Sequence, residues 1–273
     1  MTRPCLYTDL STGTIYVPGN GTGGDPVHRE TFVRASKDYG KTWGLIYAYD
    51  SPEWPQSGEG SKPRAAHGVL GIAYMASSVP DSAAKCPCLV FGASRDDGKT
   101  FERHVVPCEA PAGGGGFGMG GPLLAADPSH AGRYAIGSVA GAEIKVVVTD
   151  DFGKTWKGPV TAGGTPGARI TKPDMEYSQK GELALMWLAM NQDQTFTAWS
   201  SVSHDGGSAF RPSLQVSSAP SPSRASIKNR GNNWDGDDIA NLAVDDQYVH
   251  MVWGDLRAGF LGSWYARIPL ASY

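Results

Sequence analysis

The chain has 273 residues, a formal net charge of −3 and scattered lysines and arginines. This balance gives no basic surface for nucleic acid, and no apolar run approaches the length of a membrane span. The length suits one all-β domain, and the 36 glycines and 19 prolines suit many tight turns.

Alternating β-branched and aromatic residues, bounded by Gly, Pro, Asn or Asp, predict short strands along the whole chain, and helical periodicity is almost absent. The first strands are predicted at residues 5–9, 14–17, 31–35, 43–49, 68–76, 88–94 and 101–107. The next are predicted at 122–127, 133–138, 144–149, 156–160, 175–178, 183–188, 196–201 and 210–216. Three more are predicted at 239–244, 248–253 and 263–268.

One pattern recurs four times, each time just after a predicted strand. It has Ser or Thr first, Asp third, Gly fifth and Trp or Phe last, as in the copy from Ser36 to Trp43. The last copy, from Ser203 to Phe210, has Ala209 where the others have Thr. A fixed period of this size marks a repeat architecture. The central aspartates, at intervals of 58, 55 and 54 residues, are Asp38, Asp96, Asp151 and Asp205.

The pattern resembles the Asp-box, Ser/Thr-x-Asp-x-Gly-x-Thr-Trp/Phe, of the sialidase-like (BNR-repeat) β-propellers. The resemblance implies an all-β propeller of four-stranded antiparallel blades, with about five blades in one domain over residues 1–273. The blades are expected at about 1–52, 60–110, 118–166, 172–220 and 235–273. We interpret the four box aspartates as turn-building residues rather than catalytic ones, because Asp often caps its own turn.

The fifth repeat stops at Tyr273, where a fifth Asp-box would begin. An unpaired edge strand is a liability that propellers normally remove by closure. Because the family usually has six blades, we expect an N-terminally shortened piece of a longer propeller. Two alternatives are that five blades close imperfectly and that a partner chain covers the edge.

The cysteines are Cys5, Cys86, Cys88 and Cys108. Cys86 or Cys88 could bridge to Cys108, because both ends fall in the second repeat, and the spacing leaves the connectivity open. A Cys-x-Cys pair alone is a poor metal signature, so a structural disulfide or buried thiols are favoured over a metal site. A disulfide implies a secreted protein, although no signal segment precedes the first strand.

In an Asp-box blade the boxes join the third and fourth strands. The connections into each innermost strand lie at the opposite edge, with the turns between the second and third strands. A ligand pocket is expected at that opposite edge. The stretches predicted to lie there are 20–29, 57–67, 113–122, 169–177, 191–194, 230–238 and 255–261.

The richest of these stretches precedes the predicted strand at 239–244. Asp237 and Asp238 are our candidates for general acid and base, because adjacent carboxylates can raise one another's pKa. Arg230 and Trp234 are candidates for substrate binding. The alternative is a loop that caps its own turn or coordinates a structural calcium ion.

Residues 169–177 supply a third catalytic candidate, Glu176, with Arg169 and Asp174 as substrate-binding candidates. Glu176 beside Tyr177 resembles the family's nucleophile pair. However, neighbours along a strand point to opposite faces, which counts against a direct contact between the two side chains.

Four further substrate-binding candidates are Arg64, His67, Asp255 and Arg257. Arginines there could hold a sugar carboxylate through paired hydrogen bonds. The alternative is solvated charge or ion pairs between blades. Sialidases also use three arginines and carry an Arg-Ile-Pro motif near their start. No triad can be assigned here, and Arg267-Ile268-Pro269 follows every box.

The resemblance, together with these candidates, implies a secreted, sialidase-like, exo-acting glycoside hydrolase on an acidic or complex glycan, without a catalytic metal. Elimination instead of hydrolysis stays open. Two alternatives are a non-catalytic propeller that binds carbohydrate or protein, and a scaffold whose exposed edge strand pairs with a partner.

Overall fold

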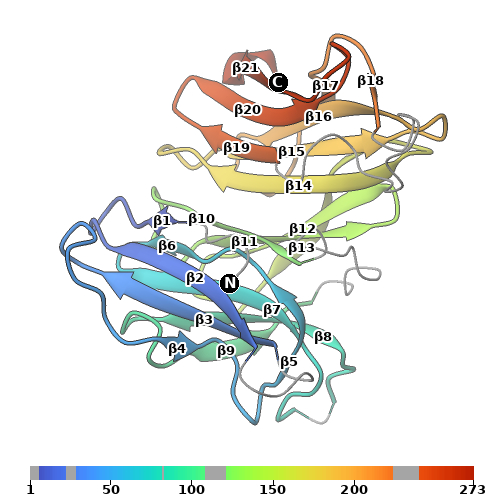
Figure 1. Cartoon of the computed structure of the whole chain (residues 1–273). Coiled ribbons are helices and arrows are strands. Elements are labelled where there is room, and N and C mark those ends of the chain that lie inside the picture. Colours follow the sequence, from blue (N-terminus) through green and yellow to red (C-terminus); the bar gives the residue numbers. More distant parts are fainter. Residues whose placement is uncertain (1–5, 23–28, 82, 108–120, 224–239) are drawn as a thin grey trace. The chain divides into compact units, whose positions relative to one another are not determined.

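The computed structural model describes residues 6–22, 29–81, 83–107, 121–223 and 240–273, which form five antiparallel sheets (Figure 1). The only described helix is a 3-10 turn at Leu270–Ser272. The predicted fold class, an all-β propeller of about five blades, is confirmed. In chain order, the first sheet contains β1 (Tyr7–Thr8), β2 (Ile15–Thr22), β3 (Arg29–Ser36) and β4 (Tyr47–Ala48).

The second sheet contains β5 (Gln56–Gly60), β6 (Arg64–Ala66), β7 (Val69–Ala76), β8 (Cys88–Ser94) and β9 (Glu102–Val105). The third contains β10 (Leu123–Ala126), β11 (Tyr134–Ala140), β12 (Glu143–Thr149) and β13 (Lys157–Gly164). The fourth contains β14 (Arg169–Tyr177), β15 (Leu183–Met190), β16 (Thr195–Ser203), β17 (Leu214–Gln215) and β18 (Ser221–Pro222). The fifth has three strands, β19 (Ala240–Val244), β20 (Tyr248–Asp255) and β21 (Gly262–Pro269).

The chain divides into two compact units. One contains residues 1–138 and 147–159, and the other contains residues 139–146 and 160–273. The first unit holds the first two sheets and part of the third. The second holds the rest of the third sheet together with the fourth and fifth.

The second sheet differs from the sequence-based expectation, because two strands precede the one predicted at 68–76. Both β5 and β6 pair with β7, and the register of β5 shifts between Gln56 and Gly60. Pro63 separates the two strands. Proline has no N–H to donate to a sheet, so the innermost strand of this blade is interrupted there.

The third Asp-box shows how the motif closes its turn. The Asp151 carboxylate accepts hydrogen bonds from the Thr155 amide at 2.8 Å, the Thr155 hydroxyl at 2.6 Å and the Thr149 hydroxyl at 2.8 Å. The Thr149 hydroxyl in turn accepts from the Gly153 amide at 2.8 Å. Although desolvation raises it, these bonds lower the pKa of Asp151 to about 2.

The fourth box keeps this turn without a threonine at position 209. The Asp205 carboxylate accepts from the amides of Ser208 at 3.0 Å and Ala209 at 2.9 Å, and from the Ser203 hydroxyl at 2.6 Å. The missing Thr hydroxyl therefore costs one hydrogen bond and leaves the backbone turn intact.

Two box glycines meet the preceding sheet at very short range. Gly98 and Gly153 both have φ +95°, and an added Cβ would lie 2.4 Å from Val33 and 2.7 Å from Phe91 respectively. Glycine is therefore required at each position for two reasons, the positive φ and the close approach of the neighbouring side chain.

Successive boxes of the first unit also contact each other. The Lys37 ammonium lies 2.6 Å from the Asp97 carboxylate, and the Arg95 guanidinium lies 4.4 Å from the ring centroid of Phe152. Both pairs join the second position of one box to the fourth position of the next.

The core of the second unit lies between the fourth and fifth sheets. Buried side chains of β15 and β16, such as Met186, Leu188 and Phe196, belong to one cluster with Met251 and Trp253 of β20. This packing covers one face of the fifth sheet and places β19 next to β14.

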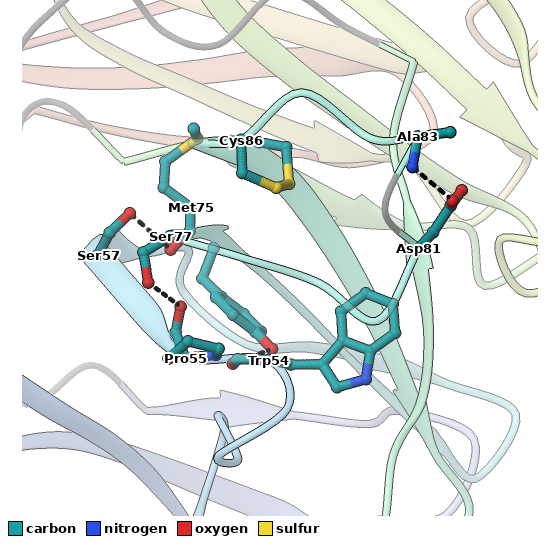
Figure 2. Close-up of a disulfide and its surroundings, with 10 residues drawn as sticks. Trp54, Pro55, Ser57, Met75, Ser77, Asp81, Ala83 and Cys86 are labelled. Carbon is teal, nitrogen blue, oxygen red and sulfur yellow. Dashed lines mark hydrogen bonds between the residues drawn. A yellow bond between two sulfur atoms is a disulfide. The ribbon is translucent and has the colours of Figure 1, made fainter.

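The cysteine pairing predicted from the sequence is wrong, because Cys86 is bonded to Cys88 and not to Cys108. Cys5 and Cys108 lie outside the described residues. Figure 2 shows the disulfide and its surroundings, which include Met75 and the segment of Trp54 and Pro55. The Ser77 hydroxyl donates to the Pro55 carbonyl at 3.4 Å, which ties the residue that follows β7 to that segment.

We expect Asp151→Ala to lower the free energy of unfolding by about 1–2 kcal/mol at pH 7, because three donors lose their acceptor. The pKa of Asp151 is lower when folded, at about 2 against 3.8. The contribution of its charge is therefore present above about pH 4 and is lost as the pH falls towards 2. Urea unfolding between pH 3 and pH 7 measures this dependence.

Asp246→Ala is the control, because it removes only an exposed ion pair with Lys180. It should change the free energy of unfolding by less than about 0.5 kcal/mol. A loss for Asp151→Ala that is the same at every pH would contradict the assignment.

We expect Gly153→Ala to cost about 2–4 kcal/mol, through backbone strain and overpacking against Phe91. Gly141→Ala is the matched control, since Gly141 has φ +63° and nothing within 4 Å of an added Cβ. It should cost only the strain, about 1 kcal/mol. Thermal unfolding of both variants compares them, and equal losses would refute the role of the close approach.

Candidate functional site

Strand register defines two edges for each sheet. In the fourth sheet Leu183 pairs with both Tyr177 and Ser203, the first residue of the box, whereas Arg169 pairs with Met190. The Tyr177 end of β14 is therefore the box edge, and the Arg169 end is what we call the loop edge. The loop edge is where the sequence predicted a ligand site.

An irregular segment of β14 begins two residues from the loop edge. The register shifts between Thr171 and Asp174, and Lys172 between them has φ +47°. Lys172 and Asp174 are each only 6% exposed. Lysine is rarely so buried, and bulges and positive φ at non-glycine residues gather at functional sites. We call Thr171–Asp174 the β14 bulge and treat it as the candidate site. Lys172 was not among the residues predicted from the sequence.

Asp174 links the innermost strands of two sheets. Its carboxylate accepts from the Met175 amide at 3.1 Å and from the Leu242 amide of β19 at 3.3 Å. Both carboxylate oxygens therefore accept hydrogen bonds from backbone amides. Asp174 thereby ties the β14 bulge to the innermost strand of the neighbouring sheet.

The structure does not bring Glu176 and Tyr177 together. Tyr177 is buried, and its hydroxyl donates to the Gly206 carbonyl in the fourth box at 2.9 Å. Glu176 is half-buried, next to Tyr177 and close to the box edge. Arg169 is exposed at the loop edge, where it was predicted. The catalytic role of Glu176 stays a prediction.

Asp255 and Arg257 lie at the loop edge of the fifth sheet, as expected, but they face each other. The fully buried Asp255 carboxylate accepts from Arg257 Nη2 at 2.6 Å, from Arg257 Nε at 3.0 Å and from the Trp253 indole at 3.0 Å. The guanidinium also lies 4.3 Å from the ring centroid of Trp264. Desolvation raises the pKa of Asp255, but these bonds outweigh it and lower the pKa. Asp255 and Arg257 therefore form an ion pair within one blade, whereas the alternative from the sequence was solvated charge or an ion pair between blades.

Arg64 and His67 belong to the first unit and lie apart from each other along the sheet. Arg64, in β6, is 5% exposed and lies 4.8 Å from the Tyr7 ring centroid. His67 is exposed on the β6–β7 turn. Because Leu70 pairs with Ser94, the first residue of the second box, that turn lies at the box edge. The structure places His67 at the edge opposite to the predicted one.

The predicted residues Asp237, Asp238, Arg230 and Trp234 lie outside the described residues. Within the described part of the chain, no group of three or more His, Cys, Asp or Glu is arranged to hold a metal ion. No described helix is long and apolar enough to cross a membrane.

A shallow cavity of about 530 Å³ occurs in the second unit, away from the β14 bulge. It is lined by residues that include Glu143, Thr161, Pro166, Phe210 and Arg211. Glu143 is paired with Lys145 at 2.6 Å. None of the predicted site residues lines this cavity, whereas the bulge contains Asp174, so the cavity is a weaker candidate than the bulge.

No family model matches the sequence, and no curated protein matches it. Solved structures do match. A protein of unknown function from Dyadobacter fermentans is 15% identical with a TM-score of 0.56, over 98% of this chain and 78% of that one. An alpha-L-arabinofuranosidase from Fusarium graminearum is 16% identical with a TM-score of 0.54, over 98% and 93%.

A Hadza microbial sialidase is 17% identical with a TM-score of 0.55, over 98% of this chain and 52% of that one. The chain thus spans about half the length of that sialidase. At these identities the similarity establishes the fold alone. The chain has the fold of the sialidase-like β-propellers.

Proposed function

We propose that the protein is a glycoside hydrolase that removes terminal sugars from an acidic or complex glycan. The observation that carries the proposal is the β14 bulge, which sets a buried lysine and a buried carboxylate into the innermost strand of one blade. Two of the similar structures, the arabinofuranosidase and the sialidase, are propeller glycosidases by name.

In this proposal the charged groups have separate roles. Asp237 and Asp238 supply the general acid and base, since glycoside hydrolysis needs a proton donor and a second carboxylate. Lys172 favours an anionic sugar, and Asp174 orients that strand through the Leu242 amide. Arg169, exposed at the loop edge, contacts the outer part of the glycan.

We also propose that the protein acts outside the cell. Complex glycans are abundant there, and disulfides persist in oxidising compartments. The Cys86–Cys88 bond agrees with such a location.

A non-catalytic carbohydrate-binding propeller is the second candidate. It is favoured by the separation of Glu176 from Tyr177, whose hydroxyl is committed to the Gly206 carbonyl. Without an assembled nucleophile pair, a bulge with one lysine and one carboxylate can bind a sugar without cleaving it.

The test is turnover of sialyl, uronyl, arabinosyl and neutral glycosides by the purified chain. We expect hydrolysis of at least one acidic class, and a loss of about 100-fold or more in kcat for Asp237→Asn/Asp238→Asn. Asp246→Asn, on an exposed turn, should stay within about twofold of the wild type. Binding of a glycan by the wild type and the double variant, without turnover by either, would favour the second candidate.

Lys172→Met tests the preference for an anionic sugar. A charge-assisted hydrogen bond contributes about 1.5–3 kcal/mol, so KM for an acidic glycoside should rise about 10-fold or more. KM for a neutral glycoside should change much less. Equal changes for both substrates, with a lower melting temperature, would assign Lys172 to stability instead.

A further inference from the structure

The fifth sheet has one covered face and one exposed face. Half-buried and exposed positions alternate along β21, whereas β8 and β15 are buried at every position. Trp253 and Trp264 belong to the face that packs against the fourth sheet. Because successive strand residues point to opposite faces, Tyr265 and Arg267 lie on the other face.

Four side chains form a continuous row on that exposed face, Tyr248 and His250 from β20 and Tyr265 and Arg267 from β21. We call this row the β20–β21 strip, and Figure 1 shows the two strands that carry it. The Arg267 guanidinium lies 4.8 Å from the Tyr248 ring centroid. Tyr248 lies 6.1 Å from His250, and His250 is stacked 6.1 Å from Tyr265 at 20°. Arg267 pairs with His250 and Tyr265 with Val252 across the two strands.

Hydrogen bonds hold the strip in place. His250 Nδ1 and the Tyr265 hydroxyl are 2.7 Å apart, and His250 Nε2 lies 2.8 Å from the Asp245 carboxylate. The bond from His250 and the amides of Gln247 and Tyr248 lower the pKa of Asp245 to about 2. Asp245 is therefore a fixed charge that orients the imidazole, which orients the phenol. Even so, Tyr265 stays 60% exposed.

The chemistry of the strip fits a glycan better than another protein sheet. The strip consists of two phenols, an imidazole and a guanidinium, so each of its four side chains combines a ring or a cation with polar atoms. The partly positive C–H groups of a sugar pack well on an aromatic face, and rigid rings lose little entropy on binding. Among the described residues no ion pair is recorded for Arg267, and a guanidinium held against a ring can still form paired hydrogen bonds with a carboxylate.

We propose that the β20–β21 strip is a second, non-catalytic binding site for an acidic glycan chain. It lies on the face of the fifth sheet opposite to the one that contacts β14, so it is separate from the β14 bulge. The strip goes beyond the proposed hydrolysis, because it would hold a polymer whether or not the bulge cleaves it.

Native gel electrophoresis in gels that contain polygalacturonate, polysialate or neutral arabinan tests this. We expect an acidic polymer to retard the wild type, and added salt to weaken the effect. Tyr265→Ala should weaken binding about three- to tenfold. Arg267→Gln should weaken binding of the acidic polymer about tenfold. Tyr265→Phe keeps the ring and should stay within about twofold of the wild type.

Tyr39→Ala is the matched control, because Tyr39 is 82% exposed in the first Asp-box. It should not change the mobility, and thermal unfolding checks that every variant is folded. No retardation by either acidic polymer, or equal retardation of wild type, Tyr265→Ala and Arg267→Gln, overturns the proposal. A dimer that Tyr265→Ala dissociates also overturns it, in favour of a second copy on the strip. Turnover of small glycosides is measured separately, so the binding result can be interpreted even if the protein does not hydrolyse glycosides.

Discussion

The close contact between a box turn and the sheet before it is the constraint on which the first unit depends. Gly98 and Gly153 bring backbone within van der Waals range of Val33 and Phe91, where a Cβ has no room. The aspartate of each box fixes the turn that makes this approach possible. Local hydrogen bonds thereby set the spacing between sheets, which is a tertiary property. This explains why the aspartates recur at nearly equal intervals although none of them shows the burial of a core residue.

The same arrangement leaves the loop edge free to vary. Turns at the box edge are closed by their own side chains, and strand pairing is regular there, as between Tyr177 and Leu183. Towards the loop edge, β14 departs from regular strand pairing at Lys172. There the Asp174 carboxylate accepts a hydrogen bond from the Leu242 amide of the neighbouring sheet. A buried lysine is costly in a regular apolar strand. A polar site is therefore most easily accommodated at the loop edge, where no Asp-box turn depends on regular strand pairing.

How well a feature could be predicted depends on how far apart in the sequence the residues that form it lie. The Asp-boxes are local, so their period predicted the repeat architecture. The alternation of side chains, which is also local, predicted most strands, including the three of the last sheet. The bulge was not predicted, because it depends on how β14 pairs with β15 and contacts β19. His67 was assigned to the wrong edge because β6 was not recognised as a strand. The partner of Cys86 was wrong for a related reason. Spacing limited the choice to one repeat, and only the fold of the segment between β7 and β8 selects Cys88.

The alternation in β20 and β21 carries information that the other sheets do not. A strand covered on both faces is apolar throughout, as β15 is. In β20, Tyr248 and His250 alternate with Val249 and Met251, so the sequence itself distinguishes a core face from a polar one. An apolar neighbour would bury the Asp245–His250 pair and the Arg267 guanidinium, and desolvating these groups is unfavourable unless new partners replace water. A ligand that brings its own hydroxyls and carboxylates supplies those partners. The pattern of residues on this face therefore favours a polar, hydrogen-bonding ligand over an apolar sheet.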